Sequence, residues 1–396
     1  MNRSRLALLT STHAVNDLYQ GLVPALLPFM VLERGYSYTA VSGLMLAASG
    51  LSSVIQPLFG LYADREPRPW MVPLGFCVAA LGLMLMGMSG SYWMSWLAAA
   101  LCGLGIAAFH PPATVAARMA GGTSQKAMSV FSVGGTIGAS FAPVLAALVV
   151  GGGMLGRSWL LTAPALVMLL VWWGCTRHDA RAASAAGNTA ARKVAPQARN
   201  DWRAFWLLCA VIVGWSIPYV TVISMIALYV TRELGGTSFQ GAATLTTFTA
   251  AGAVGTLLGG WVGDRWGRMR SIRAGYLLAI PALAGLALAG TPALAWLCTL
   301  ALGVTLFLPF AAQVTLAQDY LPRNQATASG LTLGLAMSIG GMVAPLFGML
   351  SDARGLRFTL CTVLVLFCVA TVLAWCLRNR EREMPLAEAG AAPARS

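Results

Sequence analysis

Four polar side chains lie within the first long apolar segment, residues 6–32, at spacings that place them on one face of a helix. They are His13, Asn16, Asp17 and Gln20, and the segment around them is long enough to cross a bilayer. A carboxylate at the centre of a membrane-spanning helix costs about 2.5–3.5 kcal/mol. An acid with a histidine one turn away therefore indicates a site that handles protons or ions. Asp17 is the only acid that lies well inside an apolar segment.

Two interpretations of this pair remain. Burial and a neighbouring opposite charge shift the pKa of a carboxylate or an imidazole in opposite directions. A buried Asp–His cluster can therefore titrate as one unit near neutral pH. In the alternative interpretation, His13 only hydrogen-bonds Asp17 and stabilises helix packing. We favour the first interpretation because ionisable residues inside membrane spans usually mark transport pathways.

The composition of the chain places it among membrane proteins. Of its 396 residues, 58% are hydrophobic and 10% are charged, whereas soluble domains carry about 25% charged residues. Twelve apolar segments predict an all-α protein with twelve spanning helices, and their length excludes an outer-membrane barrel. The segments are 6–32, 38–62, 70–90, 92–114, 125–150, 157–176, 204–231, 239–262, 271–290, 292–316, 325–350 and 357–377.

The distribution of lysine and arginine predicts the orientation. If both termini are cytoplasmic, five of the 26 basic residues fall on the opposite side, namely Arg34, Arg157, Arg232, Arg354 and Arg357. The formal net charge of +13 then reflects membrane topology and an anionic inner leaflet, so we expect no nucleic-acid partner. The residues between 177 and 203 read as a flexible cytoplasmic linker, and residues 378–396 read as a disordered tail.

The cysteines and glycines do not indicate an enzyme. All eight cysteines lie within or at the ends of apolar segments, and none forms a Cys-x-x-Cys pair. The glycine-rich stretch at residues 134–138 lacks the strand and the GK[ST] sequence of a phosphate loop, and we expect it to allow close helix packing. We therefore expect no metal site, no cofactor and no enzymatic activity.

The chain repeats itself at an offset close to 200 residues. The stretch Gly60–Arg68 (GLYADREPR) matches Gly260–Arg268 (GWVGDRWGR), and Ala142-Pro143 is matched by Ala344-Pro345. This repetition predicts two pseudo-symmetric six-helix bundles, residues 1–176 and 204–377.

The repeated loops carry candidate latch residues. A carboxylate at the end of a helix can face the positive N-terminal end of another helix and nearby arginines, which would hold one side of the molecule shut. Simple solvated charges that fix topology are the alternative. The residues proposed for the latch are Asp64, Arg65, Gly260, Asp264, Arg265 and Arg268.

The second loop resembles the cytoplasmic loop motif of the major facilitator superfamily, Gly-x-x-x-Asp-Arg-x-Gly-Arg. That motif is complete between Gly260 and Arg268, whereas the first copy has Pro67 in place of its second glycine. Nearly the whole chain is similar to the fosmidomycin-resistance branch of this superfamily. The stretches that carry this resemblance are 12–17 (THAVND), 56–60 (QPLFG), 69–75 (PWMVPLG), 109–111 (FHP), 129–135 (SVFSVGG) and 317–322 (AQDYLP).

The resemblance implies proton-driven export of drugs or drug-like metabolites by alternating access between the two bundles. It also implies a location in a bacterial inner membrane, the proton gradient as the energy source, and small molecules, protons and the lipid bilayer as partners of a monomer. Two positions, Pro112 and Thr136, depart from the Glu and Asn that the branch leads us to expect. A proton symporter that imports a small organic acid or other metabolite would use the same fold, so transport direction stays open.

In the implied fold, His13, Asp17 and His110 share one water-filled space between the bundles. His110 has a structural alternative, because Pro111 and Pro112 leave upstream carbonyl groups without a donor that a histidine could satisfy. The second half has Leu308 at the position equivalent to His110, so ionisable chemistry is confined to the first half. The expected substrate-cavity residues are Asn16, Gln20, Gln56, Tyr219, Ser224 and Gln313.

Overall fold

The computed structural model describes all residues except 67, 152, 186–198 and 381–396, and the secondary structure of the described residues is helical throughout. The first half contains α1 (Arg3–Arg34), α2 (Tyr38–Met45), η1 (Leu46–Gly50), α3 (Leu51–Arg65), α4 (Met71–Met88), α5 (Tyr92–Gly121), α6 (Gln125–Val150), η2 (Leu155–Thr162) and α7 (Ala163–Ala185). The second half contains α8 (Trp202–Leu228), η3 (Tyr229–Glu233), α9 (Ser238–Trp266), α10 (Arg268–Ala287), α11 (Pro292–Phe307), α12 (Phe310–Tyr320), α13 (Gln325–Ser329), η4 (Gly330–Ala336), α14 (Met337–Arg354) and α15 (Leu356–Cys376).

Each predicted apolar segment corresponds to a helix or to consecutive helical pieces. Within the described residues, eleven helices are long and apolar enough to cross a membrane. The predicted segment 271–290 falls on α10, whose first turns carry Arg268, Arg270 and Arg273 and are therefore less apolar. The predicted segment 292–316 is interrupted between α11 and α12 at Leu308 and Pro309, because proline cannot donate to the helical hydrogen-bond ladder.

The predicted linker begins too early in the sequence, and the first residues of the predicted tail contact a helix. Helix α7 continues to Ala185, nine residues into the predicted linker 177–203, because this stretch is rich in alanine and arginine, which favour helix. Residues 186–198 of the linker and 381–396 of the tail lie outside the described residues. The start of the tail is held against α10, since Arg268 donates hydrogen bonds to the side chain of Asn379 and to the carbonyl of Arg380.

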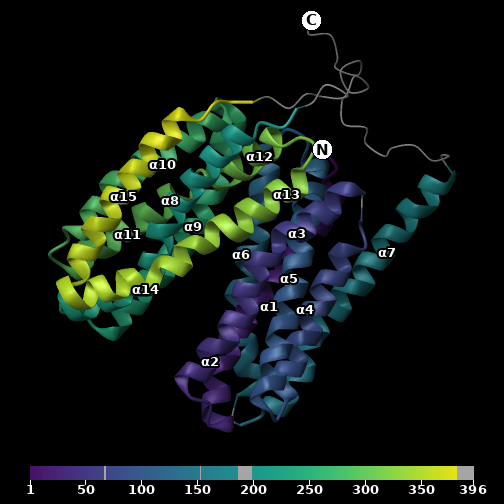
Figure 1. The fold of residues 1–396 in the computed structure, drawn as a ribbon, viewed down its shortest axis with the longest axis horizontal. Helices are drawn as coiled ribbons and strands as arrows, with labels where there is room; N and C mark the ends of the chain where they lie inside the picture. The colour runs from purple at the N-terminus through teal and green to yellow at the C-terminus, as the bar shows by residue number, and fades with distance from the viewer. Residues whose placement is uncertain (67, 152, 186–198, 381–396) are drawn as a thin grey trace, which may run out of the picture.

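The two halves form two bundles that meet at one end of the molecule. In Figure 1 the purple-to-blue first half and the green-to-yellow second half lie close together near the N-terminus, around α3, α12 and α13, and they diverge toward α2 and α14. Across the halves, α6 packs against α9, and α3 packs against α13 and η4. Each half has its own hydrophobic core. The halves are therefore in contact at the end near the N-terminus, which is the closed end, and they diverge toward the opposite end.

Candidate functional site

The carboxylate of Asp17 lies between two histidine rings from different helices. On α1, Nε2 of His13 is 3.2 Å from one carboxylate oxygen, as expected for side chains one helical turn apart. From α5, Nε2 of His110 is 3.2 Å from the other oxygen. These three side chains, which we call the proton cluster, are mostly buried, with 10%, 17% and 12% of the side chains of His13, Asp17 and His110 exposed.

The other nitrogen of each ring faces a backbone carbonyl. Nδ1 of His13 is 2.8 Å from the carbonyl oxygen of Phe131 on α6, and Nδ1 of His110 is 2.9 Å from the carbonyl oxygen of Ile106. Because a carbonyl oxygen can only accept, both Nδ1 atoms must carry hydrogen to make these bonds. Each histidine, when neutral, therefore leaves its Nε2 lone pair directed at the carboxylate.

This arrangement fixes how many protons the cluster needs. Each Nε2–oxygen contact is a hydrogen bond only if one proton lies on the nitrogen or on the oxygen, so two contacts require two protons and give a net charge of +1. Loss of one proton leaves a nitrogen lone pair against a carboxylate oxygen, which is repulsive. The proton between His110 and Asp17 is therefore needed for these two side chains to join α5 and α1.

Neighbouring side chains hold the cluster in place. The ring of His13 stacks on the ring of Phe131 at a centroid distance of 4.3 Å and lies 5.8 Å from that of Phe109. Asn16, fully buried, donates its amide hydrogen to Asp17 over 3.1 Å. Phe131 thus contacts His13 twice, through its carbonyl and through its ring, which the sequence pattern did not indicate.

His110 does not make the structural contact that its position before Pro111 and Pro112 suggested. Pro111 and Pro112 remove the donors that would reach the carbonyls of Ala107 and Ala108 in a regular helix. His110 instead contacts the carbonyl of Ile106, whose helical partner would be the backbone amide of His110 itself. The ring therefore does not replace either missing donor, and its Nε2 faces Asp17.

The same three side chains could also hold a metal ion. His13, Asp17 and His110 each offer one ligand atom, and these atoms lie within 4.8 Å of one another. Two imidazoles and a carboxylate are a ligand set that transition metals accept. The expectation of no metal site stays a prediction.

The residues expected to line the substrate cavity lie in different environments. Gln20 and Ser224 are exposed, Tyr219 is half-buried, and Asn16 is buried beside the proton cluster. Gln56 is buried and lies against Gly334 of η4 in the opposite half. A Cβ atom on Gly334 would lie only 2.6 Å from the Oε1 atom of Gln56. These positions remain candidates, and Gln56 lies at the closed end rather than in open space.

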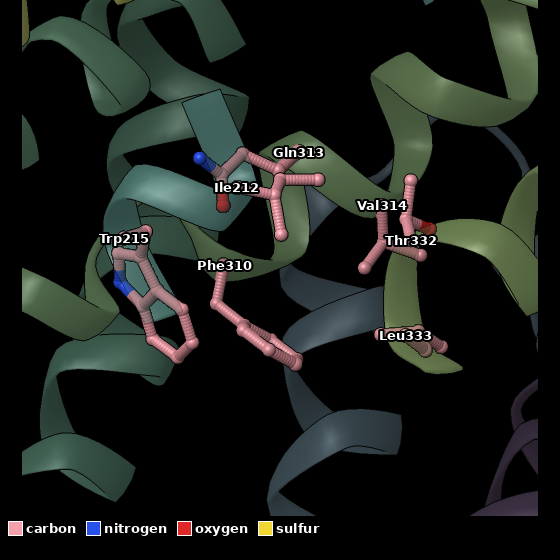
Figure 2. A pocket seen from close by; sticks show the side chains of 7 residues that line it. All are labelled: Ile212, Trp215, Phe310, Gln313, Val314, Thr332 and Leu333. Carbon is pink, nitrogen blue, oxygen red and sulfur yellow. The ribbon is translucent and has the colours of Figure 1, made fainter. Parts of the chain in front are cut away.

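Gln313 lies in a small pocket inside the second half. Figure 2 shows this pocket, whose lining is apolar except for Gln313 and Thr332 and comes from α8, α12 and η4. The amide of Gln313 donates to the hydroxyl of Tyr276 over 2.7 Å, so its nitrogen is already paired within the half. The remaining lining residues are Ile212, Trp215, Phe310, Val314 and Leu333.

The two loop carboxylates each bind the first turn of a helix in the opposite half. Asp64 at the end of α3 accepts hydrogen bonds from the backbone amides of Ala326 and Thr327, at 2.8 and 2.9 Å, and from the hydroxyl of Thr327. Asp264 at the end of α9 accepts from Ser124 over 2.7 Å and from the amides of Gln125 and Lys126 on α6.

Gly260 permits the close approach of α9 and α6. A Cβ atom there would lie 2.8 Å from the Cα of Lys126 and would collide with the hydroxyl of Ser129. Arg65 and Arg265, the other arginines proposed for the latch, are exposed. Of the residues proposed for the latch, Asp64, Asp264 and Gly260 thus contact the opposite half.

A buried charge network, which the sequence analysis did not predict, lies beside these loops. The carboxylate of Asp319 on α12 contacts Arg268 of α10 and, over 3.4 Å, Arg118 of α5. The side chains of Asp319 and Arg118 are only 2% and 3% exposed. Arg118 lies beyond the end of the predicted segment 92–114, and a basic residue at a helix end reads as a topology signal rather than as an ion-pair partner.

Comparison with known proteins identifies the family. Residues 9–345 match the Major Facilitator Superfamily. The chain belongs to this superfamily. It is 31% identical to the fosmidomycin resistance protein of Escherichia coli (strain K12) over 374 residues, which cover 93% of this chain and 91% of that protein. It is 26% identical to the multidrug resistance protein MdtG of Citrobacter koseri over 382 residues, which cover 91% of this chain and 92% of that protein.

A solved structure shares the fold. The crystal structure of the E. coli fucose:proton symporter FucP matches with a TM-score of 0.70 at 18% sequence identity, over 94% of this chain and 98% of that chain. The predictions of an all-helical membrane fold and of a member of this superfamily are thereby confirmed. The chain is a multi-pass membrane transporter rather than an enzyme, and transporters of this superfamily generally need no cofactor.

Proposed function

We propose that this transporter is a proton-coupled antiporter that exports drugs or drug-like metabolites, with fosmidomycin-type compounds among the candidates. The observation that carries the proposal is the position of Asp17 between two histidines whose Nδ1 atoms are both committed to backbone carbonyls. Release of the proton between His110 and Asp17 would break a contact between α5 and α1. The similarity to the fosmidomycin resistance protein and to MdtG supports export of drug-like compounds.

The coupling requires that protons and substrate favour different states of the transporter. A ligand shifts a conformational equilibrium only through a difference in its affinity for the two states. Protons favour the state in which α1 and α5 are joined through His110 and Asp17, as in this structure. A substrate that favours the state with this contact open would leave the cell as protons enter.

The location of the protein is part of the proposal. We propose that it lies in the bacterial inner membrane with both termini in the cytoplasm, since most of its lysines and arginines then lie inside. The closed end near the N-terminus in Figure 1 would then be the cytoplasmic end, and the end toward which the halves diverge would face outward.

A proton symporter that imports a small organic acid or another metabolite is the second candidate. The observation in its favour is the shared fold with FucP, which is named a fucose:proton symporter. Symport would require that protons and substrate favour the same state. The direction of substrate movement under an imposed proton gradient separates the two candidates.

The test uses an efflux-deficient host and purified protein in proteoliposomes. Expression should raise resistance to at least one compound in a panel of phosphonate and other antibiotics. Binding of that compound should release protons from the purified wild-type protein between pH 5.5 and 8.5. This range brackets the ordinary histidine pKa of about 6.5. Asp17→Asn should abolish both effects. Asp352→Asn, at an exposed acid of α14, is the control and should retain them. Full proton release by Asp17→Asn would contradict the proposal.

A further inference from the structure

Helix α6 supplies none of the predicted cluster residues, yet it packs directly on the contact between His13 and Asp17. Two of its residues, Phe131 and Gly135, are one helical turn apart and therefore lie on the same face. The carbonyl of Phe131 accepts the hydrogen of His13 Nδ1, and its ring stacks on the imidazole. These contacts fix both the tautomer and the plane of His13.

Gly135 faces the other side of the same contact. A Cβ atom at this position would lie 2.7 Å from Nε2 and 2.8 Å from Cε1 of His13, and it would collide with the carboxylate oxygen of Asp17. These are the two groups whose contact the cluster needs. The absence of a side chain at Gly135 leaves the space in which His13 and Asp17 meet.

The neighbouring glycines of α6 have a different role. A Cβ atom on Gly134 would lie 2.6 Å from the Cγ2 atom and 2.7 Å from the carbonyl oxygen of Thr10, and one on Gly138 would lie 2.6 Å from the carbonyl carbon of Ala14. Both positions permit close packing of α6 on α1, as expected from the sequence. Only Gly135, of these three glycines, faces the proton cluster.

We infer that Phe131 and Gly135 are positioning residues that hold His13 in its Nδ1–H form against Asp17. The inference rests on the proposed role of the cluster in proton coupling. The titratable groups that face Asp17 are His13 on α1 and His110 on α5. The charged residue of α6 is Lys126 at its beginning. Of the other elements that pack on α1, α2 and α4 carry no charged residue, η2 carries Arg157, and α7 carries its charged residues from Arg177 onward. A change at Gly135 therefore acts on the cluster by displacing its members.

The experiment observes the histidine rings directly, so it does not depend on transport. The chain has three histidines, and ¹⁵N labelling of histidine in the full-length protein gives ring signals that His110→Gln and His178→Gln assign. In the wild-type protein, neutral His13 should be in the Nδ1–H form. In Gly135→Ala, the Nε2 signal of His13 at a fixed pH should move from its wild-type position, because the added methyl group displaces His13 from the Asp17 carboxylate.

Gly134→Ala is the matched control, because it crowds the same pair of helices without touching the cluster. Its His13 Nε2 signal should match that of the wild-type protein. The inference is wrong if Gly135→Ala leaves this signal unchanged, or if Gly134→Ala shifts it equally. It is also wrong if neutral His13 of the wild-type protein carries its proton on Nε2, a result that needs no variant to fold. Failure of substrate-induced proton release would instead contradict the proposed function.

Discussion

The two halves share a backbone plan but differ in the chemistry at equivalent positions. Where α1 carries His13, Asn16 and Asp17, the corresponding positions of α8 carry Val213, Ser216 and Ile217. The second half has an aromatic group in this region, in which Trp215 stacks on Tyr219 with ring centroids 5.1 Å apart, and Phe307 lies 5.5 Å from Tyr219. Duplication of the fold therefore does not duplicate the proton cluster, and the equivalent region of the second half is aromatic.

The two loop motifs show the same kind of difference. Asp64 and Asp264 make equivalent contacts with helix starts in the opposite half. The arginines that end the two motifs make different contacts. Arg268 is buried against Asp319, whereas Arg68 pairs with Glu66, whose side chain is 74% exposed. The same motif thus ends in a buried network in one half and at the surface in the other.

The largest effect that tests this difference is expected from Asp319→Asn. The substitution removes the carboxylate that Arg268 and Arg118 share and leaves two buried guanidinium groups without it. Removing one partner of a buried ion pair costs about 3–5 kcal/mol. Thermal unfolding of the purified protein in detergent should show a clearly lower midpoint.

Glu66→Gln provides the matched control, since it removes the carboxylate partner of Arg68 in the first motif. Exposed ion pairs contribute about 0–1 kcal/mol, so this midpoint should stay close to that of the wild-type protein. If both variants unfolded at the same temperature, the buried contacts of Asp319 would contribute no more to stability than the exposed pair of Glu66 and Arg68.

A smaller effect is expected from Asp264→Asn. The charge of Asp264 at the beginning of α6 contributes about 1 kcal/mol, so its loss should raise the population open at the end near the N-terminus about fivefold. Ser129 on α6 is fully buried against Gly260 on α9. In a background without the eight native cysteines, Ser129→Cys should react about fivefold faster with a small thiol reagent when Asp264→Asn is added.

Asp64→Asn makes the equivalent change in the other loop and should also increase this reaction, because both carboxylates hold the same end closed. If neither variant changes the labelling rate, the loop carboxylates do not act as a latch. Transport should fall in Asp264→Asn while expression is retained.

The smallest effect is expected from Arg265→Gln. Arg265 belongs to the same motif as Arg268 but is exposed. Substitutions at exposed positions change stability by about 0.5 kcal/mol or less, so the labelling rate of Ser129→Cys should change less than about twofold. A fivefold change would show that the exposed arginine contributes to the latch as much as the carboxylate does.

The sequence by itself determined the features that depend on local periodicity and on repetition. Apolar segments of spanning length predicted the helices, and the internal repeat predicted the two bundles. The pairing of His13 with Asp17 followed from a spacing of four residues, because helix geometry fixes which side chains share a face. The family resemblance, rather than any spacing, indicated that His110 belongs with them.

Only the tertiary structure decided the contacts between helices. The carbonyl of Phe131 lies 118 positions from His13 in the sequence, and Asp319 lies 201 positions from Arg118. The side of a helix that meets another helix depends on how both are rotated and tilted in the packed bundle, and local patterns do not specify this. For the same reason Gly135, which reads as one more packing glycine in the sequence, lies against the proton cluster in the folded molecule.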